Sequence, residues 1–226
     1  MNRGNRREAG IPVHETFRTG ALLAVVGGFL DAYTYLLRGG VFANAQTGNI
    51  VLLAVNSAEG NGRQAMYYVA PIAAFAAGVF ITEWLKKKFT ASGFLMWEHY
   101  IIFIEVILLF FVGLAPENVP DGIVNVTVSF ICSIQVNSFR KVQNITYAST
   151  MCTGNLRSGT ENLFCFLADK NSQAGQNAVH YFGIIAFFIA GAAAGTGLVQ
   201  LWGLKSVWFC CVMLLGVFVN MMVSKE

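Results

Sequence analysis

The chain is poor in charged residues. Only 12% of its 226 residues are Asp, Glu, Lys or Arg, against roughly 25% in a typical soluble domain, whereas 55% are hydrophobic. This composition predicts an integral membrane protein whose surroundings are the lipid bilayer. The formal net charge of +3 comes mainly from flanking loops. It suits a membrane surface better than a nucleic-acid groove, so no nucleic-acid partner is expected.

The familiar catalytic and metal-binding patterns are missing from the sequence. There is no GxSxG or HExxH motif, no glycine loop that could cradle a phosphate, and no second core aspartate to pair with Asp31. The cysteines lie in apolar surroundings, and no pair has the spacing of a metal or redox site: Cys132, Cys152, Cys165, Cys210 and Cys211. We therefore expect no enzyme, no metal and no cofactor.

Residues 1–18 are polar and lack the basic, apolar and small-residue order of a cleavable signal peptide. They are predicted to form an N-terminal tail, followed by a single transmembrane domain over 19–223. The predicted fold is all-α, with six apolar spans and two short helical returns. The spans are expected at about 19–37, 65–85, 99–115, 123–142, 178–202 and 205–223, and the returns at 47–57 and 154–167.

Basic residues predict the orientation of the chain. With the N-terminus inside, nine flanking Lys and Arg residues lie in the cytoplasm and only Arg63 and Lys205 lie outside, as the positive-inside rule requires. Both termini are then cytoplasmic, provided that each interrupted segment counts as one crossing.

The first apolar run is interrupted between Asp31 and Asn49. Gly39 and Gly40 are suited to a left-handed helix end, and Thr47 or Asn49 to the start of a second, shorter helix, with 41–46 extended between them. Irregular backbone at membrane depth is tolerated only where it is buried in protein or lines a cavity. This interruption is therefore the first candidate for a functional site.

The two halves of the chain resemble each other. Thr47-Gly48-Asn49 recurs 106 residues later as Thr153-Gly154-Asn155, and 68–78 matches 181–191 at six of eleven positions. Because each repeat has three spans, the second copy must be inverted in the membrane. The repeats are predicted at about 19–115 and 123–223, each with its first helix interrupted. Paired interruptions in inverted repeats are typical of secondary transporters.

The first half carries a motif that comprises Gly28-Phe29-Leu30-Asp31-Ala32, Tyr35-Leu36, Gly39-Gly40, Phe42 and Thr47-Gly48-Asn49. The second half carries Gln135, Asn137, Arg140, Thr150, Thr153 and Gly154. These motifs resemble those of the YoaK-like family of bacterial six-span inner-membrane proteins. The resemblance covers about 18–223. It implies the fold, placement in the bacterial inner membrane and the region of the site, but no substrate.

Polar side chains around the two interruptions form the predicted solute site. They are Asp31, Asn44, Gln46, Thr47, Gly48, Asn49, Gln135, Asn137, Arg140, Thr150, Thr153, Gly154 and Asn155. Free N–H groups at helix starts and a nearby arginine favour an anionic or polar solute. Simple capping by Thr47 and Thr153 remains open, as does an interfacial role for Arg140 and Arg157.

Carboxylates within apolar segments need a partner, water or a proton. Asp31 is either a proton-coupling group or a hydrogen-bond acceptor for the interrupted backbone or for Arg38, Arg140 or Lys141. Glu105 has no nearby partner in sequence and is a second coupling candidate, whereas Glu161 should pair with Arg157 one turn away.

The predicted function is a small secondary transporter for a small polar or anionic solute, coupled to protons through Asp31 and Glu105. A passive channel and a non-transporting membrane assembly protein are the alternatives. With only six spans, a homodimer is also an expectation.

Overall fold

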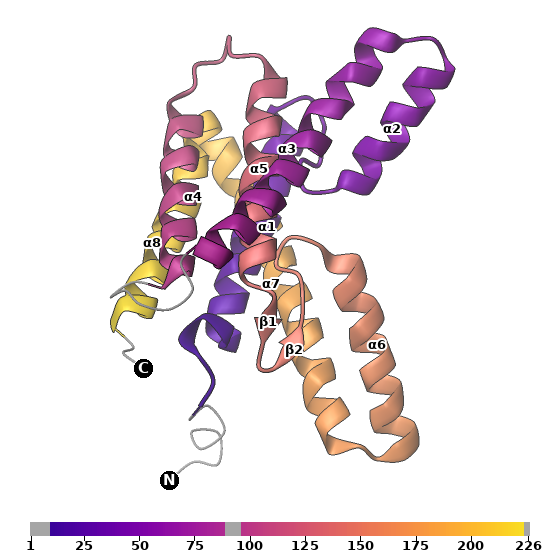
Figure 1. Ribbon diagram of the computed structural model, residues 1–226, viewed down its shortest axis with the longest axis vertical. Helices are drawn as coiled ribbons and strands as arrows, with labels where there is room; N and C mark the ends of the chain where they lie inside the picture. The colour runs from indigo at the N-terminus through magenta and orange to yellow at the C-terminus, as the bar shows by residue number, and fades with distance from the viewer. Residues whose placement is uncertain (1–9, 89–95, 224–226) are drawn as a thin grey trace.

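The computed structural model describes residues 10–88 and 96–223, and these are almost entirely helical (Figure 1). The α-helices are α1 (Phe17–Leu37), α2 (Gln46–Ala58), α3 (Gly62–Lys88), α4 (Trp97–Leu114), α5 (Asp121–Ser138), α6 (Cys152–Asp169), α7 (Ser172–Trp202) and α8 (Trp208–Val223). Short 3-10 helices, η1 (Val13–Glu15) and η2 (Gly203–Val207), precede α1 and α8.

The chain leaves helical conformation after Leu37 and re-enters it at Gln46. Gly39 and Gly40 have φ values of +81° and +71°, the left-handed conformation expected there because glycine lacks the Cβ that disfavours it. The short helix α2 then runs to Ala58 and turns directly into α3.

The second departure from helix comes earlier than the sequence predicted. Helix α5 ends at Ser138 rather than near 142, and an antiparallel hairpin follows, with β1 (Lys141–Val142) paired to β2 (Ile145–Thr146). Gln143 and Asn144 form the turn with positive φ, a conformation that Asn tolerates better than most residues. Helix α6 begins after this hairpin, at Cys152.

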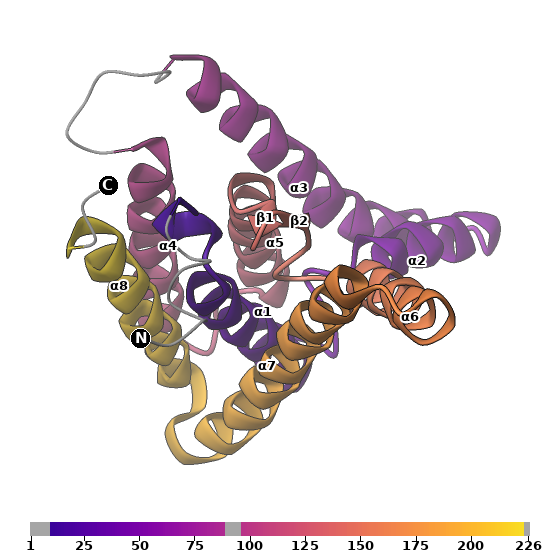
Figure 2. The same cartoon turned by 90° about the horizontal axis from the view of Figure 1, so that it is seen from below.

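Helices from the two halves of the chain are intertwined. Helix α1 packs mainly against α7, and α5 packs mainly against α3, while α4 lies against α8 and α5. The α2–α3 and α6–α7 hairpins extend from the same side of the bundle and diverge from each other (Figures 1 and 2). Helices α1 and α5 thus lie at the centre, between the interrupted segments.

Glycines allow the closest helix crossings. A Cβ on Gly28 would overlap the carbonyl oxygen of Phe188, and one on Gly191 would overlap that of Val25, so α1 and α7 are in backbone contact. Gly78 plays the same part in α3, where a Cβ would overlap Ser133 Oγ of α5. These small residues therefore allow helices of the two halves to pack closely together.

Four described segments are long and apolar enough to cross a membrane: Phe17–Leu37, Gly62–Lys88, Trp97–Leu114 and Ser172–Val223, the last covering both α7 and α8. Helix α5 was expected to span but is not among them, since its 18 residues include buried Asn125, Ser129, Ser133 and Gln135. These four polar side chains are buried within the protein.

Candidate functional site

The two interruptions meet on α1 at Gly27, the central residue of that helix. From the first interruption, Asn44 Nδ2 donates to Gly27 O at 3.2 Å. From the second, the Ser149 carbonyl packs so closely that a Cβ on Gly27 would lie 2.7 Å from its oxygen and 3.1 Å from Thr150 Cα. Each of the two interrupted segments therefore reaches the middle of α1.

Asp31 anchors the first interruption. Its Oδ1 accepts from the backbone N–H of Asn44 at 3.4 Å, and one turn later Thr34 Oγ1 accepts from the N–H of Ala43 at 3.4 Å. Of the hydrogen-bond donors predicted for Asp31, the structure therefore shows the backbone of the interrupted segment. Arg38, another of them, pairs with Asp121 instead, with 3.5 Å between Nη1 and Oδ1.

Gln46 and Asn49 join the start of α2 to its neighbours. Gln46 Nε2 donates to Ala43 O at 2.9 Å and to Ser129 Oγ on α5, and Ser129 Oγ in turn donates to Pro71 O on α3 at 2.9 Å. Asn49 Nδ2 donates to Gln46 Oε1 at 3.1 Å. The first interruption is thereby tied to both central and peripheral helices.

The second interruption is fastened by two other predicted site residues. Gln135 Nε2 donates to Ser149 Oγ at 2.9 Å and to Leu23 O on α1 at 3.2 Å. Asn155 Nδ2 donates to Ala148 O at 2.7 Å, while its Oδ1 accepts from the N–H of Ala148 at 3.1 Å. A single side-chain amide therefore satisfies both backbone polar groups of one residue, Ala148.

Two buried polar atoms at this junction have no hydrogen-bond partner among the described residues: Asn44 Oδ1 and Thr150 Oγ1. Buried polar groups are nearly always satisfied, so such atoms mark hydrogen-bonding capacity left for another molecule. Cys152, at the start of α6, follows Thr150 by two residues. The cluster formed by Asp31, Asn44, Thr150 and Cys152 is the candidate site.

The capping roles predicted at the helix starts are wrong. The N-cap residues are Ala45 for α2 and Met151 for α6, and neither makes a side-chain cap bond. The predicted Thr and Gly residues lie in the first turns and are exposed: Thr47, Gly48, Thr153 and Gly154. The sequence motif placed each helix start one or two residues too late, because the apolar cap residues carry no local signal.

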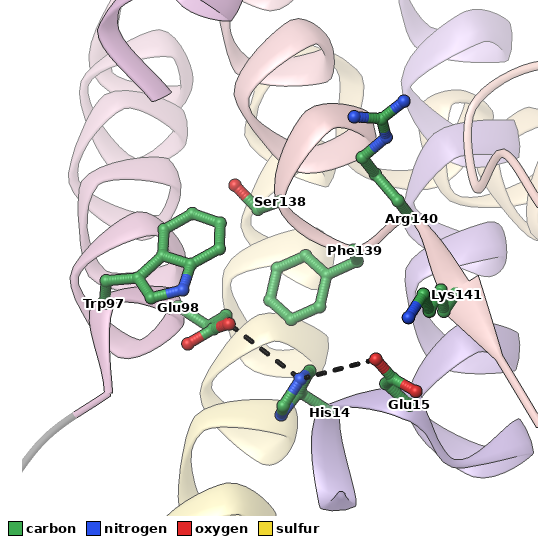
Figure 3. A pocket seen from close by; sticks show the side chains of 8 residues that line it. All are labelled: His14, Glu15, Trp97, Glu98, Ser138, Phe139, Arg140 and Lys141. Carbon is green, nitrogen blue, oxygen red and sulfur yellow. Dashed lines mark ion pairs between the residues drawn. The ribbon is translucent and has the colours of Figure 1, made fainter. Parts of the chain in front are cut away.

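Asn137 and Arg140 lie outside this cluster. Asn137 Nδ2 donates to Glu83 Oε1 on α3 at 2.9 Å. Arg140 instead lines a pocket of about 180 Å³ near η1, together with His14, Glu15 and Glu98 (Figure 3). In that pocket His14 Nε2 lies 3.9 Å from Glu98 Oε1 and 4.0 Å from Glu15 Oε1.

The remaining charged candidates differ in their surroundings. Glu105 of α4 is fully buried, and neither carboxyl oxygen has a hydrogen-bond partner among the described residues. Arg157 Nε and Glu161 Oε1 are 2.9 Å apart, which confirms the predicted ion pair within one helix turn. Ser129 and Ser149 join the site network although the sequence analysis missed them, since serine in an apolar segment gives no distinctive signal.

Comparison with known proteins places the chain in a family. Residues 19–220 match the family described as Protein of unknown function (DUF1275). Over 152 residues, covering 63% of this chain and 65% of the relative, the sequence is 28% identical to the UPF0700 transmembrane protein YoaK of Bacillus subtilis (strain 168). The chain thus spans about two thirds of that relative's length. No solved structure matches.

These matches bear out the resemblance carried by the first-half motif. The transmembrane relative and the long apolar helices together indicate a multi-pass membrane protein. The chain therefore belongs to the DUF1275 family, with the YoaK-like resemblance confirmed by both comparisons.

Proposed function

We propose that the protein is a small secondary transporter whose solute site lies where the two interruptions meet on Gly27. The observation that carries this proposal is the convergence itself. Asn44 from one interruption and Thr150 from the other lie against the centre of α1, and each has a buried polar atom with no hydrogen-bond partner among the described residues. Discontinuous segments meeting at the middle of the membrane are a recurrent site design in secondary transporters.

An inverted six-span repeat is part of the proposal. If α1 to α4 correspond to α5 to α8, each pair of packed helices has an equivalent pair. The α1–α7 contact is equivalent to the α5–α3 contact, and the α2–α3 contact is equivalent to the α6–α7 contact. The contact of α4 with α5 likewise matches that of α8 with α1. Exchange of the halves leaves the pattern unchanged, which supports duplication.

In this arrangement α1 crosses outward, α2 returns from the middle of the bilayer, and α3 crosses inward. The second half does the same from the other side, with both termini in the cytoplasm of a bacterial cell and the domain in its inner membrane. The positive-inside distribution supports this orientation. The proposal also includes association into a homodimer.

A small polar or anionic solute suits the groups at the junction. The amide and hydroxyl groups of Asn44 and Thr150 provide hydrogen bonds, and the starts of α2 and α6 contribute N–H groups and the positive ends of their dipoles. Asp31 and Glu105, two carboxyl groups within apolar helices, would couple protons. A large apolar solute would leave these groups unpaired.

The decisive experiment is a proteoliposome uptake screen of small polar and anionic solutes under an imposed pH gradient. Asp31→Asn keeps the side-chain volume and the acceptor for the Asn44 N–H, and should abolish gradient-driven accumulation. Exposed Glu117→Gln is the control and should transport normally. Accumulation that persists in the Asp31 variant would remove its coupling role.

The same vesicles separate the alternatives. A passive channel would pass current without a proton gradient, which planar-bilayer recording detects. Absence of flux for every solute class would favour an assembly protein, in which the network of Gln46, Ser129 and Gln135 serves only to hold the helices together.

A further inference from the structure

Arg38 directly follows the C-terminal end of α1 and is buried, with 1% of its surface exposed. Its Nη1 faces Asp121 Oδ1 at 3.5 Å, a long separation for a charge-assisted hydrogen bond. Its Nε and Nη2 atoms have no hydrogen-bond partner among the described residues. One edge of a buried cation is therefore unpaired.

Neutral groups hold Arg38 in place. Its carbonyl oxygen accepts from Asn125 Nδ2 at 2.9 Å, and its N–H donates to Thr34 O at 2.9 Å. The Tyr33 hydroxyl interacts with the Arg38 side chain and donates to Leu204 O of η2 at 3.2 Å. The arginine is thus held by neutral groups of α1 and α5, which do not neutralise its charge.

The unpaired edge has the geometry of an oxyanion receptor. The Nε and Nη2 atoms of a guanidinium form the parallel pair of donors that binds a carboxylate or phosphate through two oxygens. A buried cation without full pairing is costly, which makes ligand binding there favourable. Asn125 Oδ1, on the same asparagine that holds the Arg38 carbonyl, is also buried without a partner among the described residues.

Asp121 is the carboxylate that pairs with Arg38. Its side chain is 41% exposed, and it is the first residue of α5, where the helix dipole already favours negative charge. Gly39 leaves space beside it, since even a Cβ there would lie 3.5 Å from Asp121 Oδ2.

We propose that Arg38 forms an oxyanion-binding site, distinct from the site at Gly27, in which Nε and Nη2 bind a carboxylate or phosphate group and Asp121 acts as the resident competitor. The oxyanion comes either from a free solute or from the phosphate of a lipid headgroup. This site does not depend on the transport proposal.

The test uses the full chain purified in dodecyl maltoside and a buffer free of phosphate and carboxylates, with ionic strength held constant by chloride. Inorganic phosphate and benzoate are titrated, and thermal stabilisation is recorded. We expect saturable binding that weakens at least tenfold in Arg38→Gln, because both donors of the fork are lost. Exposed Arg63→Gln is the matched control and should bind as the unmodified chain does.

Asp121→Asn provides an independent arm that keeps the arginine. Removal of the competing charge should tighten phosphate and benzoate binding threefold or more. If Arg38→Gln does not fold, this variant carries the test alone. Equal affinity in the unmodified chain and in Asp121→Asn would overturn the proposal, as would equal affinity in a folded Arg38→Gln.

Two further arms identify the source and location of the oxyanion. If a lipid is the ligand, native mass spectrometry should show phospholipid bound to the unmodified chain. This phospholipid should be absent from Arg38→Gln and should be displaced by added phosphate. Phosphate binding with no difference in retained lipid would instead assign a free solute. Exposed Arg18→Gln, at the opposite end of α1, should leave phosphate affinity unchanged, and a loss equal to that in Arg38→Gln would refute binding at Arg38.

Discussion

The Asn44 side chain donates to the carbonyl oxygen of Gly27 at 3.2 Å and so joins the end of one interruption to the middle of the helix that precedes it. The same glycine is packed against the Ser149 carbonyl from the second interruption. A residue with a side chain could not accept both neighbours at this distance. The meeting of the two interruptions on α1 therefore depends on one glycine.

Gly27→Ala should destabilise the protein by about 1–3 kcal/mol, the usual cost of overpacking a close contact. The added Cβ would lie 2.7 Å from Ser149 O and push the second interruption away from α1. Thermal unfolding in nanodiscs measures the effect. Gly197→Ala is the control, because a Cβ there meets no heavy atom within 4 Å, and it should leave stability unchanged or raise it. Equal melting temperatures for the two variants would contradict the packing.

Asn155→Asp should loosen the second interruption. Aspartate keeps the acceptor for the Ala148 N–H but loses the donor to Ala148 O, leaving a carbonyl unpaired at a cost of about 1–3 kcal/mol. Hydrogen exchange should accelerate over 147–151.

Asn56→Asp makes the same chemical change in an exposed bond to Leu52 O and should not alter that exchange. If both variants give the same protection, Asn155 does not hold the segment.

Glu105→Met should stabilise the chain. Both Glu105 oxygens are buried without a hydrogen-bond partner among the described residues, so an apolar side chain of similar size should raise the unfolding free energy by about 1–3 kcal/mol. A destabilising buried carboxyl group is expected where it serves a function such as proton coupling. Glu105→Met should then lose gradient-driven uptake.

Exposed Glu59→Met controls for the loss of one negative charge and should change neither stability nor uptake. A clear drop in the melting temperature of Glu105→Met would instead show that the carboxyl group makes a stabilising contact.

Reporter fusions should place equivalent loops on opposite sides of the membrane. Alkaline phosphatase fused after Gly60, between α2 and α3, should be active, and green fluorescent protein fused after Lys170, between α6 and α7, should fluoresce. This is the outcome that an inverted repeat requires. Exchange of the reporters should silence both, and two loops on the same side would rule out inversion.

The positions of the helices follow from local sequence features. Apolar runs separated by glycines and polar turns predicted α1 and α2 to within two residues, because the positive φ of Gly39 and Gly40 is an intrinsic preference. The end of α5 was misplaced for an equally local reason. Phe139 and Val142 are apolar and buried, so the hairpin that contains Val142 resembled a continuation of the helix.

The composition of the site depends on helix packing. Gln135 and Asn137 are two residues apart on α5 and therefore project in different directions. Gln135 reaches Leu23 and Ser149, whereas Asn137 contacts Glu83. The sequence motif contains both residues and cannot separate them.

Apolar content and glycine spacing were thus enough to establish a helical membrane protein with two interrupted segments, because they act between near neighbours in the chain. Tertiary structure alone decided that both segments end at Gly27 and that Arg38 faces Asp121 rather than Asp31. Those contacts join residues far apart in sequence, and they exist only once α1, α5 and their partner helices have packed.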